Sequence, residues 1–121
     1  MADYAVEIDV DNLNTSHGLI VDLVGSGRRV LDVGCWTGDT GRVLLARGCT
    51  VSGVELDAEA AEIARADLEQ VVVADLDASA LTELFPTGSF DVVVLGDVLE
   101  HLADPVRVLT DAASLLAPGG G

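Results

Sequence analysis

The chain has 121 residues, of which 50% are hydrophobic, so it is long enough to bury one core and too short for two domains. Its formal net charge is −15 and all six basic residues are arginine, which argues against a basic face that binds nucleic acid. No apolar run approaches the roughly 20 residues of a membrane helix, and the acidic N-terminus lacks the apolar region of a secretory signal.

The acidic balance has two interpretations, a solubilising surface or a field that favours a cationic ligand. The only cysteines, Cys35 and Cys49, do not form a C-x-x-C pattern. We therefore expect reduced thiols in a cytoplasmic protein. Because the sequence contains no candidate membrane helix, we expect no membrane partner. The composition does not indicate an oligomeric state.

Short apolar runs alternate with helical stretches, which is the pattern of βαβ units. We expect, in chain order, a helix over 16–24, a strand over 29–33, a helix over 40–47 capped by Gly48, a strand over 50–54, a helix that begins at Asp57, a strand over 71–73, a short helix over 79–84 ended by Pro86, a strand over 90–95, and a helix opened by Asp104 and Pro105.

The last three strands are near-continuous runs of valine and leucine, which are typical of parallel strands buried on both faces. The predicted fold class is α/β, a Rossmann-like, doubly wound and mainly parallel sheet with helices on both faces, truncated after about the fourth strand. We divide the chain into an N-terminal segment with a covering helix, 1–27, and a ligand-binding core, 28–121, that is incomplete.

An acidic residue stands at or just beyond the carboxyl end of each predicted strand. These residues are Asp32, Glu55, Asp75 and Asp97. Ligands of doubly wound sheets bind beyond the carboxyl ends of the strands, so the four side chains are candidates for one site. The alternative is that polar residues collect at strand ends without any function, which is harder to accept for four strands together.

A glycine-rich turn, VLDVGCWTGDTG over 30–41, follows the first strand, and Glu55 comes about 20 positions after it. Two ligand classes fit a glycine turn with such an acidic residue, dinucleotides and S-adenosylmethionine, because both carry a ribose whose hydroxyls can donate to a carboxylate. A dinucleotide places its pyrophosphate against the loop, where Asp32 and Asp39 would repel it. S-adenosylmethionine presents an ammonium that Asp32 can pair with, and a carboxylate that loop amides can hold.

The glycine spacing also fits a dinucleotide loop poorly. Gly34, Gly38 and Gly41 form G-x-x-x-G-x-x-G, and Trp36 stands where the dinucleotide fingerprint needs its second glycine. These features favour a zwitterionic ligand with a cationic centre.

Five segments, in order across residues 30–121, resemble the motifs of class I S-adenosylmethionine-dependent methyltransferases. They are VLDVGCWTGDTGRVLLARG, VSGVELD, VVVADLDA, FDVVVLGDVLEHLADP and LLAPGGG. The resemblance is to the small-molecule and ubiquinone-biosynthesis-like group of that family. It implies S-adenosyl-L-methionine as cofactor, methyl transfer to a small-molecule acceptor, and a seven-stranded complete domain of which this chain supplies about four strands.

The resemblance also implies roles for individual residues. Asp32 supports the methionine amine, Glu55 binds the ribose hydroxyls, and Leu56 packs on the adenine. The other cofactor-binding positions that it implies are Gly34, Cys35, Trp36 and Gly38 in the loop, Asp75 and Leu76 at the adenine amino group, and Gly96 and Asp97 beside the methyl group. Because the acceptor site is incomplete, we do not expect turnover by residues 1–121 alone.

His101 is the candidate general base if the methyl acceptor is a hydroxyl, although a capping or packing role at the last helix is the simpler interpretation. His17 either lines the substrate side or is solvated. Asp97, Glu100 and His101 resemble part of a metal site found in some relatives, but a further ligand is lacking, and we expect no metal. Two alternatives remain open: a non-catalytic Rossmann-like binding or assembly module, and an NAD(P)-dependent oxidoreductase domain.

Overall fold

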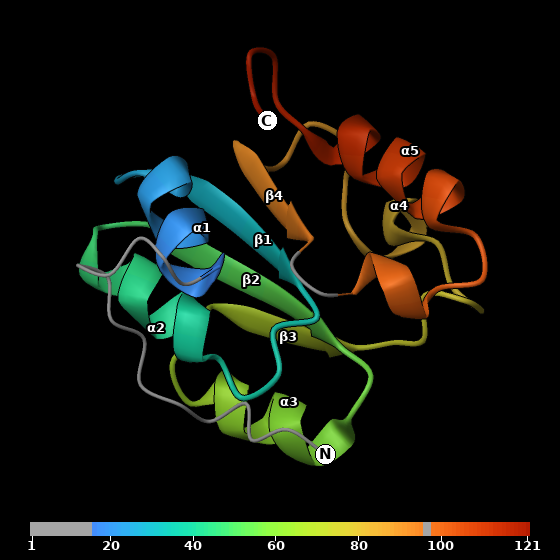
Figure 1. Ribbon diagram of the computed structural model, residues 1–121, viewed down its shortest axis with the longest axis horizontal. Helices are drawn as coiled ribbons and strands as arrows, with labels where there is room; N and C mark the ends of the chain where they lie inside the picture. The colour runs from blue at the N-terminus through green and yellow to red at the C-terminus, as the bar shows by residue number, and fades with distance from the viewer. Residues whose placement is uncertain (1–15, 96–97) are drawn as a thin grey trace.

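The computed structural model describes residues 16–95 and 98–121, in which four parallel strands form one sheet in the order β3-β2-β1-β4 (Figure 1). The elements are α1 (Ser16–Val24), β1 (Arg29–Val33), α2 (Asp39–Ala46), β2 (Thr50–Glu55), α3 (Ala58–Arg65), β3 (Gln70–Val73), α4 (Leu81–Leu84), β4 (Val92–Leu95), the 3-10 helix η1 (Leu99–His101) and α5 (Pro105–Leu115). The predicted α/β class is confirmed.

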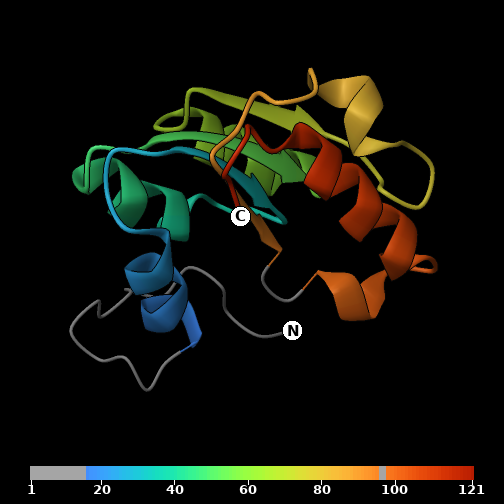
Figure 2. The same ribbon diagram turned by 90° about the horizontal axis from the view of Figure 1, so that it is seen from above.

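Helices cover both faces of the sheet, as predicted. α1, α2 and α3 lie on one face, and α4 and α5 lie on the other (Figures 1 and 2). Each face has its own apolar core, because side chains of a strand alternate between faces. Val30 and Val51 belong to the core under α1–α3, whereas Leu31 and Val54 belong to the core under α4 and α5.

The helix ends follow the capping residues that the sequence contains. The Asp57 carboxylate accepts hydrogen bonds from the amides of Glu59, at 2.9 Å, and Ala60, at 3.1 Å, and α3 begins directly after it. Asp104 accepts from the Arg107 amide at 3.1 Å at the start of α5. Such caps are worth about 1 kcal/mol each because they satisfy amides that have no partner within the helix.

Two predicted elements are longer than the observed ones. The helix expected over 79–84 begins only at Leu81, because the Ser79 amide donates to the Asp75 carbonyl in a turn and Ala80 has an extended backbone. The strand expected from Phe90 begins at Val92. Phe90 instead bridges to Leu116, since its amide donates to Leu115 O at 3.0 Å and its carbonyl accepts from Ala117 N at 2.7 Å.

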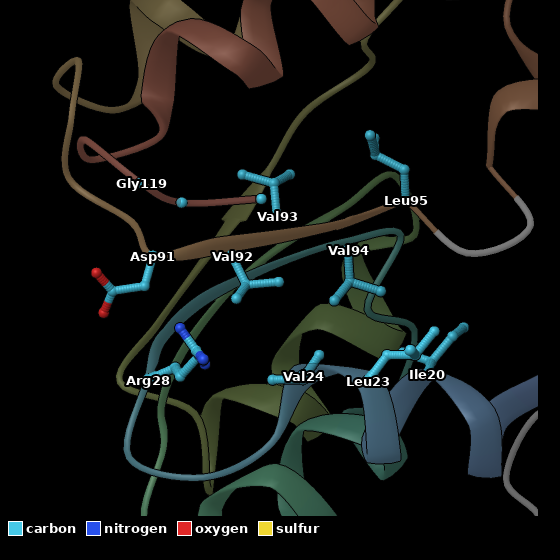
Figure 3. A pocket seen from close by; sticks show the side chains of 12 residues that line it. Ile20, Leu23, Val24, Arg28, Asp91, Val92, Val93, Val94, Leu95 and Gly119 are labelled. Atoms are coloured by element: carbon cyan, nitrogen blue, oxygen red, sulfur yellow. The ribbon is translucent and has the colours of Figure 1, made fainter.

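An open apolar groove runs along the outer edge of β4. Figure 3 shows Val92 and Val94 of β4 pointing toward Ile20, Leu23 and Val24 of α1. The final glycines line its other side, and the amide of Val93 donates to the Gly121 carbonyl at 3.0 Å. Of the predicted cofactor residues that the structure describes, none lines this groove.

No helix in the described ranges is both long enough and apolar enough to cross a lipid bilayer.

Candidate functional site

The parallel register brings the ends of β1 and β2 together. Asp32 lies opposite Gly53, and Val33 lies opposite Val54. Because side chains alternate along a strand, Asp32 and Glu55 lie on the same face of adjacent strands. Both side chains are buried, with relative exposures of 6% and 7%. The expectation that strand-end carboxylates gather at one edge therefore holds for this pair.

The glycine loop between β1 and α2 folds back over the end of β2. The amides of Gly34 and Cys35 both donate to the Val54 carbonyl, at 2.8 and 3.1 Å. Gly34 has φ +78° and Gly38 has φ +89°, which are conformations that a side chain makes costly. A β-carbon on Gly34 would also lie 3.4 Å from Cβ of Val98, so the Val98 side chain lies close to the loop.

Trp36 is the exception in this loop. It has φ +51°, and it is the only non-glycine residue of the described chain with a positive φ. Its amide donates to Glu55 Oε1 at 2.8 Å. A residue other than glycine at such an angle carries a cost of roughly 1–2 kcal/mol, which other contacts must offset.

Glu55 connects two loops. Its Oε1 accepts from the Trp36 amide, and its Oε2 accepts from the Asp57 amide, each at 2.8 Å. One carboxylate thus joins the β1–α2 loop to the β2–α3 loop, with charge-assisted bonds on both oxygens.

The electrostatic environment of Asp32 differs from that of Glu55. Burial, and then the negative charge of Glu55, raise the pKa of Asp32 from 3.8 to about 7. Within residues 16–95 and 98–121, no hydrogen bond to its carboxylate is formed. A buried carboxylate without a donor is chemically suited to an ammonium group, which would supply both a charge and hydrogen bonds.

Cys35 contacts the sheet beneath the loop. Burial, followed by the charges of Asp32 and Glu55, raises the pKa of its thiol to about 12, so it stays protonated at neutral pH. A β-carbon on Gly53 would lie 2.6 Å from Cys35 Sγ. Cys35 therefore packs against the bare backbone of β2, and both cysteines are free thiols, as predicted.

The structure corrects the role expected for Asp39. Its carboxylate forms an ion pair with Arg42 and accepts from the Thr37 hydroxyl at 3.2 Å. Arg42 also donates to the Thr37 carbonyl, at 2.9 Å, and to Asp67, at 3.2 Å. Because Arg42 balances the charge of Asp39, Asp32 is the carboxylate that would repel a pyrophosphate at this loop.

The residues expected around an adenine lie on the loops after β2 and β3. Leu56 is 67% exposed, which is unusual for a leucine. The exposed Asp75 accepts from the Asp77 amide at 2.9 Å. The Leu76 side chain is buried and its carbonyl accepts from the Arg107 guanidinium. Leu56 and Asp75 thus leave side-chain surface open to a ligand.

The remaining candidate residues lie after β4 and on α1. Gly96 and Asp97 lie outside the described residues, as does the side chain of His17. His101 is on η1, where its Nε2 lies 3.5 Å from Glu100 Oε1, and both side chains are about 70% exposed.

Sequence reasoning missed three participants in this site: Arg42, Val98 and the backbone amide of Asp57. The i,i+3 spacing of Asp39 and Arg42 is a signal for their ion pair. Backbone amides carry no such signal, because every residue except proline has one.

Comparison with known proteins identifies the family to which the chain belongs. The family described as "Methyltransferase domain" matches residues 31–121. The chain belongs to this methyltransferase family and has the Rossmann-like fold of its class I, S-adenosylmethionine-dependent members.

Two curated relatives are ubiquinone biosynthesis O-methyltransferases. The protein of Bordetella avium is 39% identical over 106 residues, which cover 84% of this chain and 44% of that protein. The protein of Paracidovorax citrulli is 36% identical over 99 residues, which cover 78% of this chain and 41% of that protein. The chain thus spans less than half the length of these relatives.

Two solved structures share the fold. An S-adenosylmethionine-dependent methyltransferase from Mesorhizobium loti matches with a TM-score of 0.74 and 27% identity, over 93% of this chain and 53% of that chain. A TehB-like methyltransferase from Corynebacterium glutamicum matches with a TM-score of 0.70 and 28% identity, over 87% and 58% of the two chains.

Proposed function

We propose that this chain is the cofactor-binding part of an enzyme that transfers a methyl group from S-adenosylmethionine to a small-molecule acceptor. The observation that carries the proposal is the buried Asp32 carboxylate, which has no donor among the described residues and lies beside the glycine loop. A ligand with a cationic centre satisfies that carboxylate, whereas a pyrophosphate does not.

The chain offers a partner for each part of the cofactor. Asp32 would bind the methionine ammonium, and amides of the loop over 34–38 would bind the methionine carboxylate. The ribose hydroxyls would donate to lone pairs of Glu55 that its two backbone contacts leave free. Leu56 would cover one face of the adenine, and Asp75 would accept from the adenine amino group.

When bound, the cofactor supplies an electrophilic methyl group on a sulfonium. The protein's task is then to hold the acceptor in line with that methyl group and to exclude water. His101 is our candidate for removing a proton from a hydroxyl acceptor, and the segment after β4 that carries it also contacts the glycine loop through Val98. The names of the curated relatives support an oxygen acceptor.

Calorimetry with three ligands tests the proposal: S-adenosylmethionine, S-adenosylhomocysteine and NADH. We expect the first two to bind and NADH not to bind. Asp32→Asn should weaken S-adenosylhomocysteine binding by at least tenfold, since a charge-assisted bond is worth about 1.5–3 kcal/mol. Asp22→Asn, which removes an exposed carboxylate on α1, is the matched control and should not change the affinity.

Binding of NADH alone would replace the proposal with a dinucleotide-dependent function. If S-adenosylhomocysteine binds, methyl transfer is then assayed with the full-length protein, labelled S-adenosylmethionine and a panel of phenols. His101→Ala should lower the turnover number of a phenol substrate and leave S-adenosylhomocysteine affinity unchanged.

A further inference from the structure

Glu55 has contacts that a ribose ligand alone does not explain. Its two carboxylate oxygens each accept a backbone amide at 2.8 Å, one from Trp36 and one from Asp57. These donors belong to different loops, and the Glu55 side chain that joins them is 7% exposed.

At Trp36, the loop has a backbone conformation that is unfavourable for a residue with a side chain. Trp36 holds φ +51° although it has a side chain, and its amide faces Glu55 in that conformation. On either side of Trp36, the loop is tied by Cys35 N to Val54 O at 3.1 Å and by Gly38 N to Cys35 O at 2.9 Å. The hydrogen bond from its own amide to Glu55 Oε1 ties the Trp36 backbone to β2.

The Asp57 end fixes the other loop. Asp57 caps α3 with its side chain, while its amide donates to Glu55 Oε2. Leu56 lies between Glu55 and Asp57, so the path of the chain past Leu56 is set by this bond. A single carboxylate thus positions both the loop proposed for the methionine end and the residue proposed for the adenine end of the cofactor.

We propose that Glu55 is a positioning residue that holds the β1–α2 and β2–α3 loops in their binding conformation before the cofactor arrives. This inference rests on the proposed function and goes beyond a ribose contact. A loop that is already ordered loses less conformational entropy on binding, so Glu55 strengthens contacts that it does not make itself.

Amide hydrogen exchange of the ligand-free protein tests the connection directly. In Glu55→Ala, we expect the Trp36 and Asp57 amides to exchange about tenfold faster or more, which corresponds to the loss of one charge-assisted bond each. In Glu55→Gln, one oxygen remains as an acceptor while the amide nitrogen faces an N–H group, so one of the two amides should be released. Glu69→Gln, an exposed site before β3, is the matched control.

Exchange of amides in the β1–β2 ladder shows in the same experiment whether each variant is folded. If that ladder stays protected and the Trp36 and Asp57 amides exchange at the wild-type rate in both Glu55 variants, the proposal is wrong.

Two ligands then separate positioning from ribose contact. S-adenosylhomocysteine has the amino acid end that the glycine loop is proposed to hold, whereas methylthioadenosine has the ribose and adenine without it. We expect Glu55→Ala to weaken S-adenosylhomocysteine binding about tenfold more than methylthioadenosine binding. Equal losses for the two ligands would overturn the positioning role at the glycine loop. If neither ligand binds the wild-type chain, the proposed function fails, while the exchange rates still decide whether Glu55 orders the loops.

Discussion

Asp32 and Glu55 are buried carboxylates on the same face of adjacent strands, and the charge of Glu55 adds to burial in raising the pKa of Asp32 to about 7. Glu55 is compensated by two backbone amides. Asp32 is the member of the pair that gains most from a cation. The two side chains therefore have different tasks, although they are chemically alike.

The raised pKa of Asp32 makes stability depend on pH. In the unfolded chain this group ionises near pH 3.8, and in the folded chain near pH 7, so the folded state binds more protons between these values. The free energy of unfolding should therefore fall as pH rises from about 4 to 7. Asp32→Asn should flatten this slope and stabilise the protein at pH 8 by on the order of 2–4 kcal/mol.

Urea unfolding at several pH values measures this effect. Asp22→Asn serves as the control, because it also removes one negative charge but at an exposed site. A wild-type slope that survives in Asp32→Asn would show that Asp32 is not its source.

Cofactor binding should release a proton from Asp32. At pH 6 the free protein holds Asp32 mostly protonated, and an ammonium beside it favours the ionised form. Calorimetric titration of S-adenosylhomocysteine at pH 6, in two buffers that differ in ionisation enthalpy, should report release of up to about one proton. The affinity should increase from pH 5.5 to pH 8. Asp32→Asn should abolish both effects, and an unchanged proton count in that variant would contradict the assignment.

Cys35 and Gly53 should be energetically coupled. Gly53→Ala brings a β-carbon to within 2.6 Å of Cys35 Sγ and 3.1 Å of Cys35 Cβ, so we expect it to destabilise the protein by about 1–3 kcal/mol. Cys35→Ala removes the sulfur atom and should recover part of that loss in the double variant. A double-mutant cycle from chemical unfolding measures the coupling. Strict additivity of the two single changes would show that the two residues do not compete for this space.

Gly38 and Gly27 provide a matched pair at positive φ. Gly38 has φ +89° and a β-carbon there would lie 3.2 Å from Ala64 Cα, whereas Gly27 has φ +68° and open space around it. Both alanine variants carry the cost of the left-handed conformation, roughly 1 kcal/mol. Gly38→Ala should cost more, because it also pushes the glycine loop away from α3. Thermal unfolding compares the two variants, and equal losses would mean that only the backbone angle matters.

Much of the fold could be predicted from local patterns. The bounds of α1 and β1 agree with the prediction, because apolar runs and glycines mark them clearly. The start of β4 could not be predicted from local sequence. Phe90 is an apolar residue typical of a strand, and it lies outside β4 because it pairs instead with the distant Leu116. The start of α4 depends on a turn at Asp75, which propensity does not reveal.

Part of the site could also be predicted from local sequence patterns. The closeness of Asp32 and Glu55 follows from their places at the ends of parallel strands. The i,i+3 spacing of Asp39 and Arg42 is a signal for their ion pair, whereas the contacts of Glu55 with two backbone amides depend on a loop geometry that the residue types do not indicate.

The most direct test of where the cofactor binds is a map of amide chemical-shift changes on addition of S-adenosylhomocysteine to the isotope-labelled chain. We expect the changes to concentrate in the loop over 34–39, at Leu56 and Asp57, and at Asp75 and Leu76. Changes confined to the groove between α1 and β4, or no changes in a chain that gives a folded spectrum, would contradict it.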